Sequence, residues 1–262
     1  MKPDYKNWVP KGMVAGVVCA AALTGAGTIV FAATRLIPNG ALRGLLAAVF
    51  GIAFAVCAGF SVWGVMAYRA FSYRGKRRLS KKIIEGVAGY VKVPEGGRIL
   101  DVGCGSGALA IACAKRNPRG TVVGLDRWGK EYDFSKSLCE RNAKAEGVGN
   151  ASFVQGDAVR LDFEDESFDA VTSNYVYHNI PGKDKQELVL ETLRVLKKGG
   201  VFAIHDLMSA RRYGDIQAFA RLLRERGYRR VELVDTENGM FMSRKESKRL
   251  MLEGSTLLVG VK

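Results

Sequence analysis

ILDVGCGSG, residues Ile99 to Gly107, is the stretch that decides the fold. An apolar run ends at Val102, and glycines then stand at every second position, as Gly103, Gly105 and Gly107. Because glycine has no side chain, the backbone here can turn sharply and approach a bound molecule closely. We therefore predict a strand, a glycine-rich loop and a helix that begins near Gly107.

Short apolar runs and helical segments alternate around this loop. We predict strands at Arg98–Val102, Thr121–Leu125, Ser152–Gln155, Phe168–Ser173, Val201–His205, Arg230–Val234 and Thr256–Val261, and helices near 107–116, 133–146, 183–197 and 214–227. This alternation predicts an α/β fold, a Rossmann-like seven-stranded, mostly parallel sheet with helices on both faces. Such a sheet binds its ligand beyond the carboxyl ends of its strands.

Two uncharged runs precede this region, Gly12–Thr34 with 23 residues and Gly44–Tyr68 with 25. Each is long enough to cross a hydrocarbon core as a helix, which takes about 20 residues. The segment between them contains the turn signal Pro38-Asn39-Gly40, so the two helices would form an antiparallel hairpin. We predict that residues 1–70 are a membrane anchor with two transmembrane helices, at about 12–34 and 44–68.

Residues 1–82 carry twelve Lys and Arg against one acid, Asp4, so most of the formal charge of +14 lies beside the apolar runs. This excess predicts contact with an anionic lipid bilayer. The positive-inside rule then predicts a multi-pass protein of the cell membrane with the domain that follows the hairpin on the cytoplasmic side. The alternative for the first run is a cleavable signal peptide, whose apolar core of ~7–15 residues would be shorter. The spacing of Gly12 and Gly16 would fit a homodimer through the hairpin.

Behind the anchor we expect a basic linker and a first domain helix over residues 71–97, with Ser80 as the cap of a helix that runs to about Val91. Residues 98–262 then form the main domain. The five cysteines are odd in number and lack the spacing of metal ligands. We therefore expect no disulfide framework and no metal site, and a reducing compartment.

Four further landmarks follow the glycine loop in order. Asp126 closes the second predicted strand, GDA occupies residues 156–158, LDFEDESFDAVTSN occupies 161–174, and RVLKKGG occupies 194–200. Together they resemble the class I S-adenosyl-L-methionine-dependent methyltransferases, and most nearly the ubiquinone/menaquinone C-methyltransferase type. The resemblance covers about residues 80–262, although Lys198 stands where that family usually has proline. An NAD-dependent oxidoreductase would need residues for hydride transfer, and we find none.

The resemblance implies S-adenosyl-L-methionine as methyl donor and gives the landmarks their roles. Asp101 would lie near the ammonium group of the methionine part, Asp126 would accept hydrogen bonds from two ribose hydroxyls, and Asp157 would meet the adenine amine. Asp126 could instead cap a helix, and Trp128 could cover the adenine or simply pack. The predicted donor-binding residues are Asp101, Gly103, Cys104, Gly105, Gly107, Asp126, Arg127, Trp128, Gly156, Asp157, Ala158 and Asn174.

Methyl transfer is an in-line displacement, and a base is needed where the attacking atom carries a proton. Our candidate catalytic residues are His178, Tyr177 and His205. His178 follows the fourth strand, where this family's acceptor pocket meets the donor, and would act as base or only shape the pocket. His205, at the end of the fifth strand, would act as a base or a positioning residue. Tyr175 and Tyr177 alternate, so at most one of them faces the pocket.

Nucleic acid is not an expected partner, because residues 174–177, NYVY, lack the two prolines of the tetrapeptide in nucleic-acid amino-methyltransferases. The arginines between 211 and 230 form either a solvated helical face or a surface for anionic headgroups. We predict a membrane-anchored methyltransferase for a small, lipophilic or membrane-associated acceptor. The alternatives are a methyltransferase for a soluble amine, thiol or phenol, and a non-enzymatic membrane protein that binds S-adenosyl-L-methionine.

Overall fold

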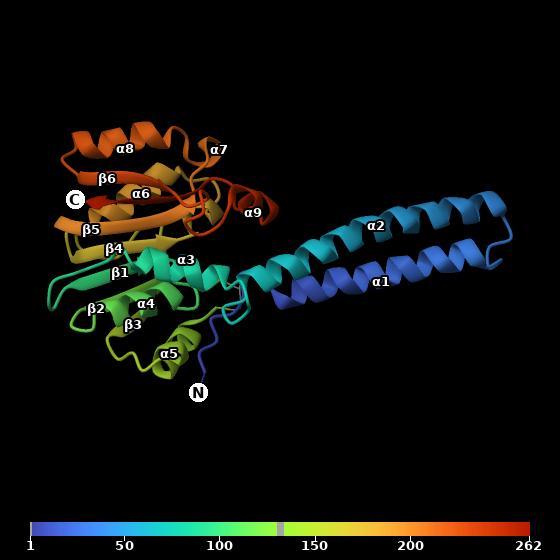
Figure 1. Cartoon of the computed structure of the whole chain (residues 1–262), viewed down its shortest axis with the longest axis horizontal. Coiled ribbons are helices and arrows are strands. Elements are labelled where there is room, and N and C mark those ends of the chain that lie inside the picture. Colours follow the sequence, from blue (N-terminus) through green and yellow to red (C-terminus); the bar gives the residue numbers. More distant parts are fainter. Residues whose placement is uncertain (1, 130–133) are drawn as a thin grey trace. The chain divides into compact units, whose positions relative to one another are not determined.

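The structure, a computed structural model, describes residues 2–129 and 134–262. The described chain divides into two compact units (Figure 1). One unit is Asn7–Ser80, and the other joins Lys81–Lys262 to the N-terminal segment that ends at Lys6. Each unit has its own architecture.

A mixed sheet lies at the centre of the larger unit and has seven strands, counted over the described residues. These are β1 (Arg98–Val102), β2 (Thr121–Asp126), β3 (Ala151–Gln155), β4 (Phe168–Asn174), β5 (Leu196–Leu207), β6 (Arg229–Asp235) and β7 (Ser255–Val261). Their order is β3-β2-β1-β4-β5-β7-β6; β7 is antiparallel to both neighbours, and the other paired strands are parallel. The predicted sheet is confirmed, although β5 begins at Leu196 rather than at Val201.

Helices connect the strands. After the hairpin they are α3 (Leu79–Ala88), α4 (Ala108–Arg116), α5 (Lys136–Ala145), α6 (Lys185–Arg194), α7 (Ala210–Tyr213), α8 (Ile216–Glu225) and α9 (Arg244–Arg249), with a 3₁₀ turn, η1, at Tyr177–Asn179. The connections through α4 and α5 lead from β1 to β2 and then to β3, toward one edge of the sheet. The connection through α6 leads from β4 to β5, toward the opposite edge. Because parallel crossovers are right-handed, α6 covers the face opposite to α4 and α5.

The predicted helices are present with shorter bounds. The helix expected at 133–146 spans Lys136–Ala145, and residue 133 lies outside the described residues. The prediction for Ser80 was wrong. Ser80 is the second residue of α3, and its hydroxyl donates to the carbonyl of Phe71 at 2.6 Å instead of capping the helix. That helix also ends at Ala88, before Val91.

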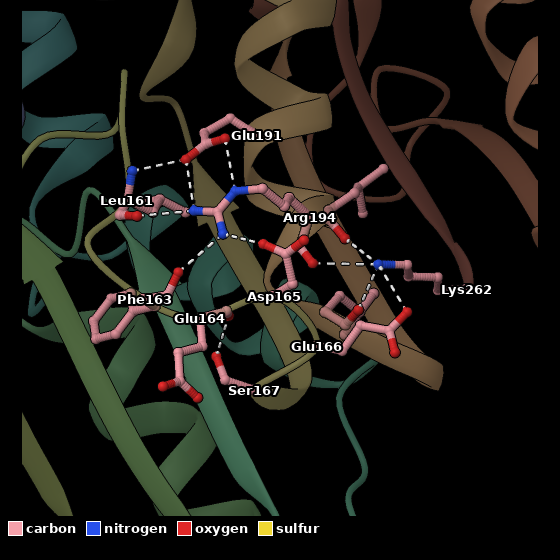
Figure 2. Close-up of polar contacts among 11 residues, drawn as sticks. Leu161, Phe163, Glu164, Asp165, Glu166, Ser167, Glu191, Arg194 and Lys262 are labelled. Atoms are coloured by element: carbon pink, nitrogen blue, oxygen red, sulfur yellow. Dashed lines mark hydrogen bonds and ion pairs between the residues drawn. The ribbon is translucent and has the colours of Figure 1, made fainter.

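The motif around Arg194 ties the β3–β4 connection to the end of α6 (Figure 2). The Arg194 guanidinium donates to the carbonyls of Leu161 at 2.8 Å and Phe163 at 2.9 Å, and it pairs with Asp165 and Glu191. This cluster lies where β4 begins, at the end of the sheet opposite to the carboxyl edge. The RVLKKGG landmark therefore has a structural role that holds β4 in place.

The core of the larger unit lies between the sheet and its helices. Leu100 and Phe202 are fully buried there, on β1 and β5, and they pack with Leu193 of α6 and Phe219 of α8. Burial of such side chains contributes about 1.5–3 kcal/mol each. Packing against these helices thus holds in place the strands that carry the site.

The N-terminal segment belongs to this same unit. The Asn142 amide of α5 accepts from the backbone N–H of Asp4 at 2.7 Å and donates to its carbonyl at 3.0 Å. The same amide donates to the carbonyl of Ser106 in the glycine loop at 3.0 Å, and the Tyr5 hydroxyl donates to Glu146 at 3.2 Å. The residues that precede the hairpin are therefore held by the domain that follows it.

The smaller unit is an antiparallel hairpin of α1 (Lys11–Ala33) and α2 (Gly40–Phe71). Both helices are long and apolar enough to cross a membrane by length and composition, as the described residues show. The two pack closely through glycine, since a Cβ at Gly27 would lie 2.3 Å from the Phe50 ring. The second helix is longer than predicted: it begins at Gly40, where Asn39 caps it by accepting from the N–H of Leu42 at 3.1 Å.

Candidate functional site

The predicted site residues gather along the carboxyl edge of the parallel strands. The strand order reverses between β1 and β4, and a ligand of such a sheet binds at this reversal. The loop after β1 and the segment after β4 meet there, because a Cβ at Gly103 would lie 2.3 Å from Val176. Only glycine fits this position, and its φ of 73° is also one that other residues avoid.

The glycine loop is held from the neighbouring strand. The N–H groups of Gly103 and Cys104 donate to the carbonyl of Leu125 at 2.8 and 3.0 Å. Gly107, with a φ of 80°, precedes the first residue of α4. The Cys104 side chain is buried, which raises the pKa of its thiol well above the usual range. The loop therefore offers a fixed backbone surface at the start of a helix, with Cys104 as a neutral side chain.

Asp126 links this loop to the end of β2. Its carboxylate accepts from the N–H of Gly105 at 2.8 Å and from the N–H of Trp128 at 2.7 Å. A carboxylate has about four acceptor positions, so two remain for hydroxyl donors. The alternative of a helix cap is excluded, because α5 begins at Lys136 and is capped by Ser135. Asp126 is therefore fixed in place with acceptor capacity to spare.

Trp128 folds back over the loop. Its indole N–H donates to the carbonyl of Gly105 at 3.0 Å, and its backbone φ is 46°. Its position fits packing against the loop, the second of the two roles considered for it. Arg127, between Asp126 and Trp128, is exposed, and its carbonyl accepts from Gln155 at 3.3 Å.

Asp101 is the most unusual group at the edge. It is almost completely buried at the end of β1, where one carboxylate oxygen accepts from the Thr172 hydroxyl at 2.8 Å. The other oxygen, Oδ2, has no hydrogen-bond partner among the described residues. Burial raises the pKa of Asp101 to about 7. A buried acceptor without a partner is costly, and a cationic ligand would relieve that cost.

The adenine side of the predicted site follows β3. The N–H of Gly156 donates to the carbonyl of Asp126 at 3.0 Å, and a Cβ at Gly156 would lie 2.6 Å from Leu125. Asp157 is exposed, and its carboxylate accepts from the N–H of Val159 at 2.8 Å. Ala158 is half-buried beside it. The structure thus brings this group next to Asp126.

His205 and Asn174 form a buried pair across β4 and β5. His205 is fully buried, with Nδ1 at 2.8 Å from the Asn174 amide oxygen and Nε2 at 3.1 Å from the Thr236 hydroxyl. Its ring packs against Tyr175, with ring centres 4.6 Å apart. Burial lowers the pKa of His205 to about 3, so the ring is neutral. Both of its nitrogens are occupied.

His178 has a different environment. Its Nδ1 is hydrogen-bonded to Asp206 Oδ1, and its backbone N–H donates to Asp206 Oδ2 at 3.0 Å. The side chain is 15% exposed, and within the described part of the chain its Nε2 has no hydrogen-bond partner. The Tyr213 hydroxyl donates to the same carboxylate at 2.7 Å. A histidine with one nitrogen held by a carboxylate and the other open is arranged to accept a proton.

Tyr177 is not brought to this edge. It is fully buried in the core, its hydroxyl lies 2.6 Å from that of Thr192, and burial raises its pKa. Tyr175 lies beside both histidines instead, and its hydroxyl is 2.7 Å from that of Ser255. Sequence reasoning missed Asp206 and Tyr213. Asp206 adjoins His205 at the end of a strand, which was a usable signal, whereas nothing in the sequence marks Tyr213.

Known proteins are similar to parts of this chain. Residues 100–204 match the family described as "Methyltransferase domain". A demethylmenaquinone methyltransferase of Geobacillus kaustophilus is 39% identical over 121 residues, which cover 45% of this chain and 48% of that protein. One of Staphylococcus aureus is 40% identical over 111 residues, which cover 42% of each. The chain thus spans about half the length of the curated relatives it matches.

Solved structures share the fold. A geranyl diphosphate methyltransferase in complex with GPP and sinefungin has a TM-score of 0.56 at 15% identity, with 74% of this chain and 82% of that one covered. The cyclase SpnF has a TM-score of 0.54 at 19% identity, with 70% and 81% covered. Residues 100–204 are thus similar to a methyltransferase domain, and that similarity implies S-adenosyl-L-methionine as methyl donor.

Proposed function

Starting from a chain whose residues 100–204 are similar to a methyltransferase domain, we propose that the protein transfers a methyl group from S-adenosyl-L-methionine to a small, lipophilic acceptor at the membrane. The observation that carries the donor half is the buried, unpartnered Oδ2 of Asp101 beside the glycine loop. An ammonium group at that oxygen would supply both the missing hydrogen bond and the missing countercharge.

The donor's other parts would follow the carboxyl edge. Asp126 keeps two acceptor positions for ribose hydroxyls, and Asp157 stands after the next strand for the adenine amine. The glycines at 103, 105 and 107 leave room for close approach of the backbone. These assignments need no movement of the strands, because all three loops leave neighbouring members of one sheet.

The proposed chemistry needs few groups. S-adenosyl-L-methionine, when bound, supplies a methyl group on a positively charged sulfur. The chain's own residues then align the acceptor and remove its proton. His178 is our candidate base because its Nε2 is open, and we assign His205 a positioning role because both of its nitrogens are bonded. Asn174 orients His205, and Tyr177 belongs to the core in this proposal.

Membrane anchoring is the second half of the proposal. The apolar windows of α1 and α2 are only 6% and 0% buried inside the protein, which is unlike a core helix and suits contact with lipid. The α2 helix spans about 48 Å at 1.5 Å per residue, longer than a hydrocarbon core of about 30 Å. That length leaves Arg43 and Arg69, near its two ends, within reach of headgroups.

The orientation of the anchor has independent support. The N-terminal segment and the methyltransferase domain belong to one compact unit, so both ends of the hairpin emerge on the same side of a membrane. Of the twelve Lys and Arg of residues 1–82, only Arg35 and Arg43 lie at the turn of the hairpin, and the excess near its two ends favours the cytoplasm for that side. The demethylmenaquinone methyltransferases among the relatives act, by their names, on a lipophilic ring, which favours an acceptor of that kind here.

The test has two steps with the full chain in detergent or lipid. Calorimetry with S-adenosyl-L-methionine should give one binding event per chain, weakened in Asp126→Ala. Methyl-labelled donor is then incubated with a membrane lipid extract and, separately, with a water-soluble cell extract. Label in the lipid fraction supports the proposal, whereas label confined to soluble amines, thiols or phenols favours a soluble acceptor.

A second candidate function rests on one observation. The fold is shared with the [4+2]-cyclase SpnF, so this fold alone does not establish methyl transfer. A membrane protein that binds the donor without using it would give calorimetric binding and no labelled product with either extract. The open Nε2 of His178 argues against that outcome, because a purely sensory site has no use for a base.

A further inference from the structure

We propose that Asp206 and Tyr213 are positioning residues that hold His178 as the base, and that the acceptor therefore belongs to the class whose attacking group gives up a proton when it is methylated. This inference rests on the proposed function, because it concerns how the same site handles the acceptor's proton. It goes further in naming two residues and the chemical class of the acceptor.

The Asp206 carboxylate is fully occupied by neighbouring donors. Oδ1 accepts from His178 Nδ1 and from the N–H of Leu207 at 2.7 Å. Oδ2 accepts from the N–H of His178 at 3.0 Å and from the Tyr213 hydroxyl at 2.7 Å. Four bonds saturate the acceptor positions of a carboxylate, so Asp206 has none left for a substrate or an ion. Its role is to hold His178 and Tyr213 in position.

The carboxylate also keeps its charge. Burial acts to raise the pKa of Asp206, but the hydrogen bonds from His178, Tyr213 and Leu207 and the charge of His178 outweigh it, so that the pKa lies below its usual value. Tyr213 stays protonated, because burial and the neighbouring carboxylate raise its pKa. The tyrosine is therefore a donor throughout, and Asp206 faces His178 as an ionised carboxylate.

This arrangement selects one form of the neutral imidazole. An ionised carboxylate against Nδ1 requires that nitrogen to carry the proton, which leaves the lone pair on Nε2. The backbone N–H of His178 binds the same carboxylate, so the main chain and the ring are fixed together. Oriented imidazoles of this kind serve as bases in hydrolases, where a buried Asp selects the same form. His205 lacks such a partner, and both of its nitrogens are bonded.

The acceptor class follows from what such a base can do. A neutral imidazole held in this way can take a proton from a hydroxyl or a thiol that becomes methylated, as the imidazole of a Ser-His-Asp triad does from serine. A thioether or a neutral amine already has its lone pair and needs no base to attack. The aromatic surroundings also suit a flat ring, since the Tyr175 ring meets His178 edge-on with centres 6.0 Å apart.

The step balances without any further reactant. The proton of the attacking group passes to Nε2 of His178 as an electron pair of that group forms a bond to the methyl carbon. The bond between methyl and sulfur breaks, and its electron pair stays on sulfur, which becomes neutral. Asp206 stabilises the imidazolium, which afterwards releases its proton to solvent.

The first test reads the imidazole directly and needs no acceptor. The chain has only two histidines, so labelling them with ¹⁵N gives two ring signals, assigned with His178→Gln. At about pH 9 the ring of His178 should carry its proton on Nδ1 in the wild-type chain. In Asp206→Asn the amide can donate to Nδ1, so the proton should move to Nε2. Tyr213→Phe should give an intermediate population, and Tyr228→Phe, a matched loss of a hydroxyl elsewhere, should change nothing.

The second test uses labelled S-adenosyl-L-methionine with a panel of simple phenols, hydroquinones, amines and thiols. We expect methylation of acceptors that lose a proton from oxygen or sulfur, and a loss of about 10²- to 10⁴-fold in kcat for Asp206→Asn with donor binding unchanged. A wild-type proton on Nε2, or product from amines alone that is indifferent to Asp206→Asn, would overturn the inference and leave the proposed function intact. Failure of donor binding in the wild-type chain would instead defeat the proposed function.

Discussion

Replacing Asp101 with asparagine should stabilise the free protein at alkaline pH and weaken donor binding at the same time. The reason is that Asp101 is buried and one of its oxygens has no partner among the described residues. Its negative charge therefore lowers the free energy of unfolding until a cationic ligand binds beside it. Asparagine keeps the shape and can still accept from the Thr172 hydroxyl. The two effects have opposite signs, which separates a binding residue from a purely structural one.

The magnitude follows from the pKa. In the free folded protein the pKa of Asp101 is about 7, against a usual 3.8. Between these values the folded state binds the proton and the unfolded state does not, so stability falls as pH rises and the loss is complete above pH 7. At 1.36 kcal/mol per pH unit the loss is about 4 kcal/mol. The new buried amide lacks an acceptor, which costs about 1–3 kcal/mol, so the net gain in Asp101→Asn should be about 1–3 kcal/mol.

Thermal unfolding of the full chain in detergent, from about pH 5 to pH 9, measures this. The melting temperature of Asp101→Asn should exceed that of the wild type above pH 7, by about 2–4 °C per kcal/mol, and the difference should shrink as pH falls. Donor affinity at pH 8 should drop about 10- to 150-fold, the loss of one charge-assisted bond of about 1.5–3 kcal/mol. A variant that is less stable at pH 9, or that binds the donor normally, would refute the reasoning.

Asp169→Asn is the matched control, because its pH dependence has the opposite sign. Burial acts to raise the pKa of Asp169, but the Arg98 N–H at 2.8 Å and the Lys197 ammonium at 3.0 Å outweigh it and lower that pKa. Its contribution to stability is present at neutral pH and is lost as pH falls through the lowered pKa. Asp169→Asn should therefore be less stable than wild type at neutral pH and match it in acid, with donor affinity unchanged.

Three further substitutions test other parts of the site and its support. Asp126→Ala should weaken donor binding at least tenfold by calorimetry, because it removes charge-assisted bonds of about 1.5–3 kcal/mol each. If the variant binds the donor as tightly as the wild type, the ribose does not lie at Asp126. Gly103→Ala should abolish binding through the clash with Val176, whereas Gly147→Ala, with a similar φ of 69° but open space around it, should lose only about 1 kcal/mol of stability. Arg194→Met should lower unfolding stability by about 2–3 kcal/mol in denaturant titrations and spare donor affinity; weaker binding would contradict its place at the opposite end of the sheet.

The fold was predictable because its signals are local and periodic. Each buried strand is a short apolar run, and the strand ends carry glycine or an acid, as at Val102–Gly103 and at Asp126. The N-terminal segment was not predictable in this way. Its bonds to Asn142 join residues 138 positions apart, and an asparagine inside a helix carries no signal of such a partner.

The donor side of the site was easier to predict than the acceptor side for a related physical reason. The proposed donor residues Asp101, Gly103 and Asp126 lie in or beside a loop whose shape the sequence itself specifies. Asp206 and Tyr213 act on His178 across the space between β5, α7 and η1, through side chains whose meeting depends on packing. Only the adjacency of Asp206 to His205 hinted at a polar cluster there.

Backbone strain explains why the two tyrosines exchanged roles. The prediction that at most one of Tyr175 and Tyr177 faces the pocket was argued from their alternation, and that reason was wrong, because residues two apart on an extended strand lie on the same side of the chain. The strand ends at Asn174, and Tyr175 adopts a φ of 55°, a left-handed conformation that costs a bulky residue about 1–3 kcal/mol. The following turn buries Tyr177 in the core and leaves Tyr175 between the histidines. Such strain persists only where surrounding contacts impose it, and here it sets the Tyr175 ring edge-on to the ring of His178, with centres 6.0 Å apart. The break in local preference thus falls at the segment on which the proposed proton transfer depends.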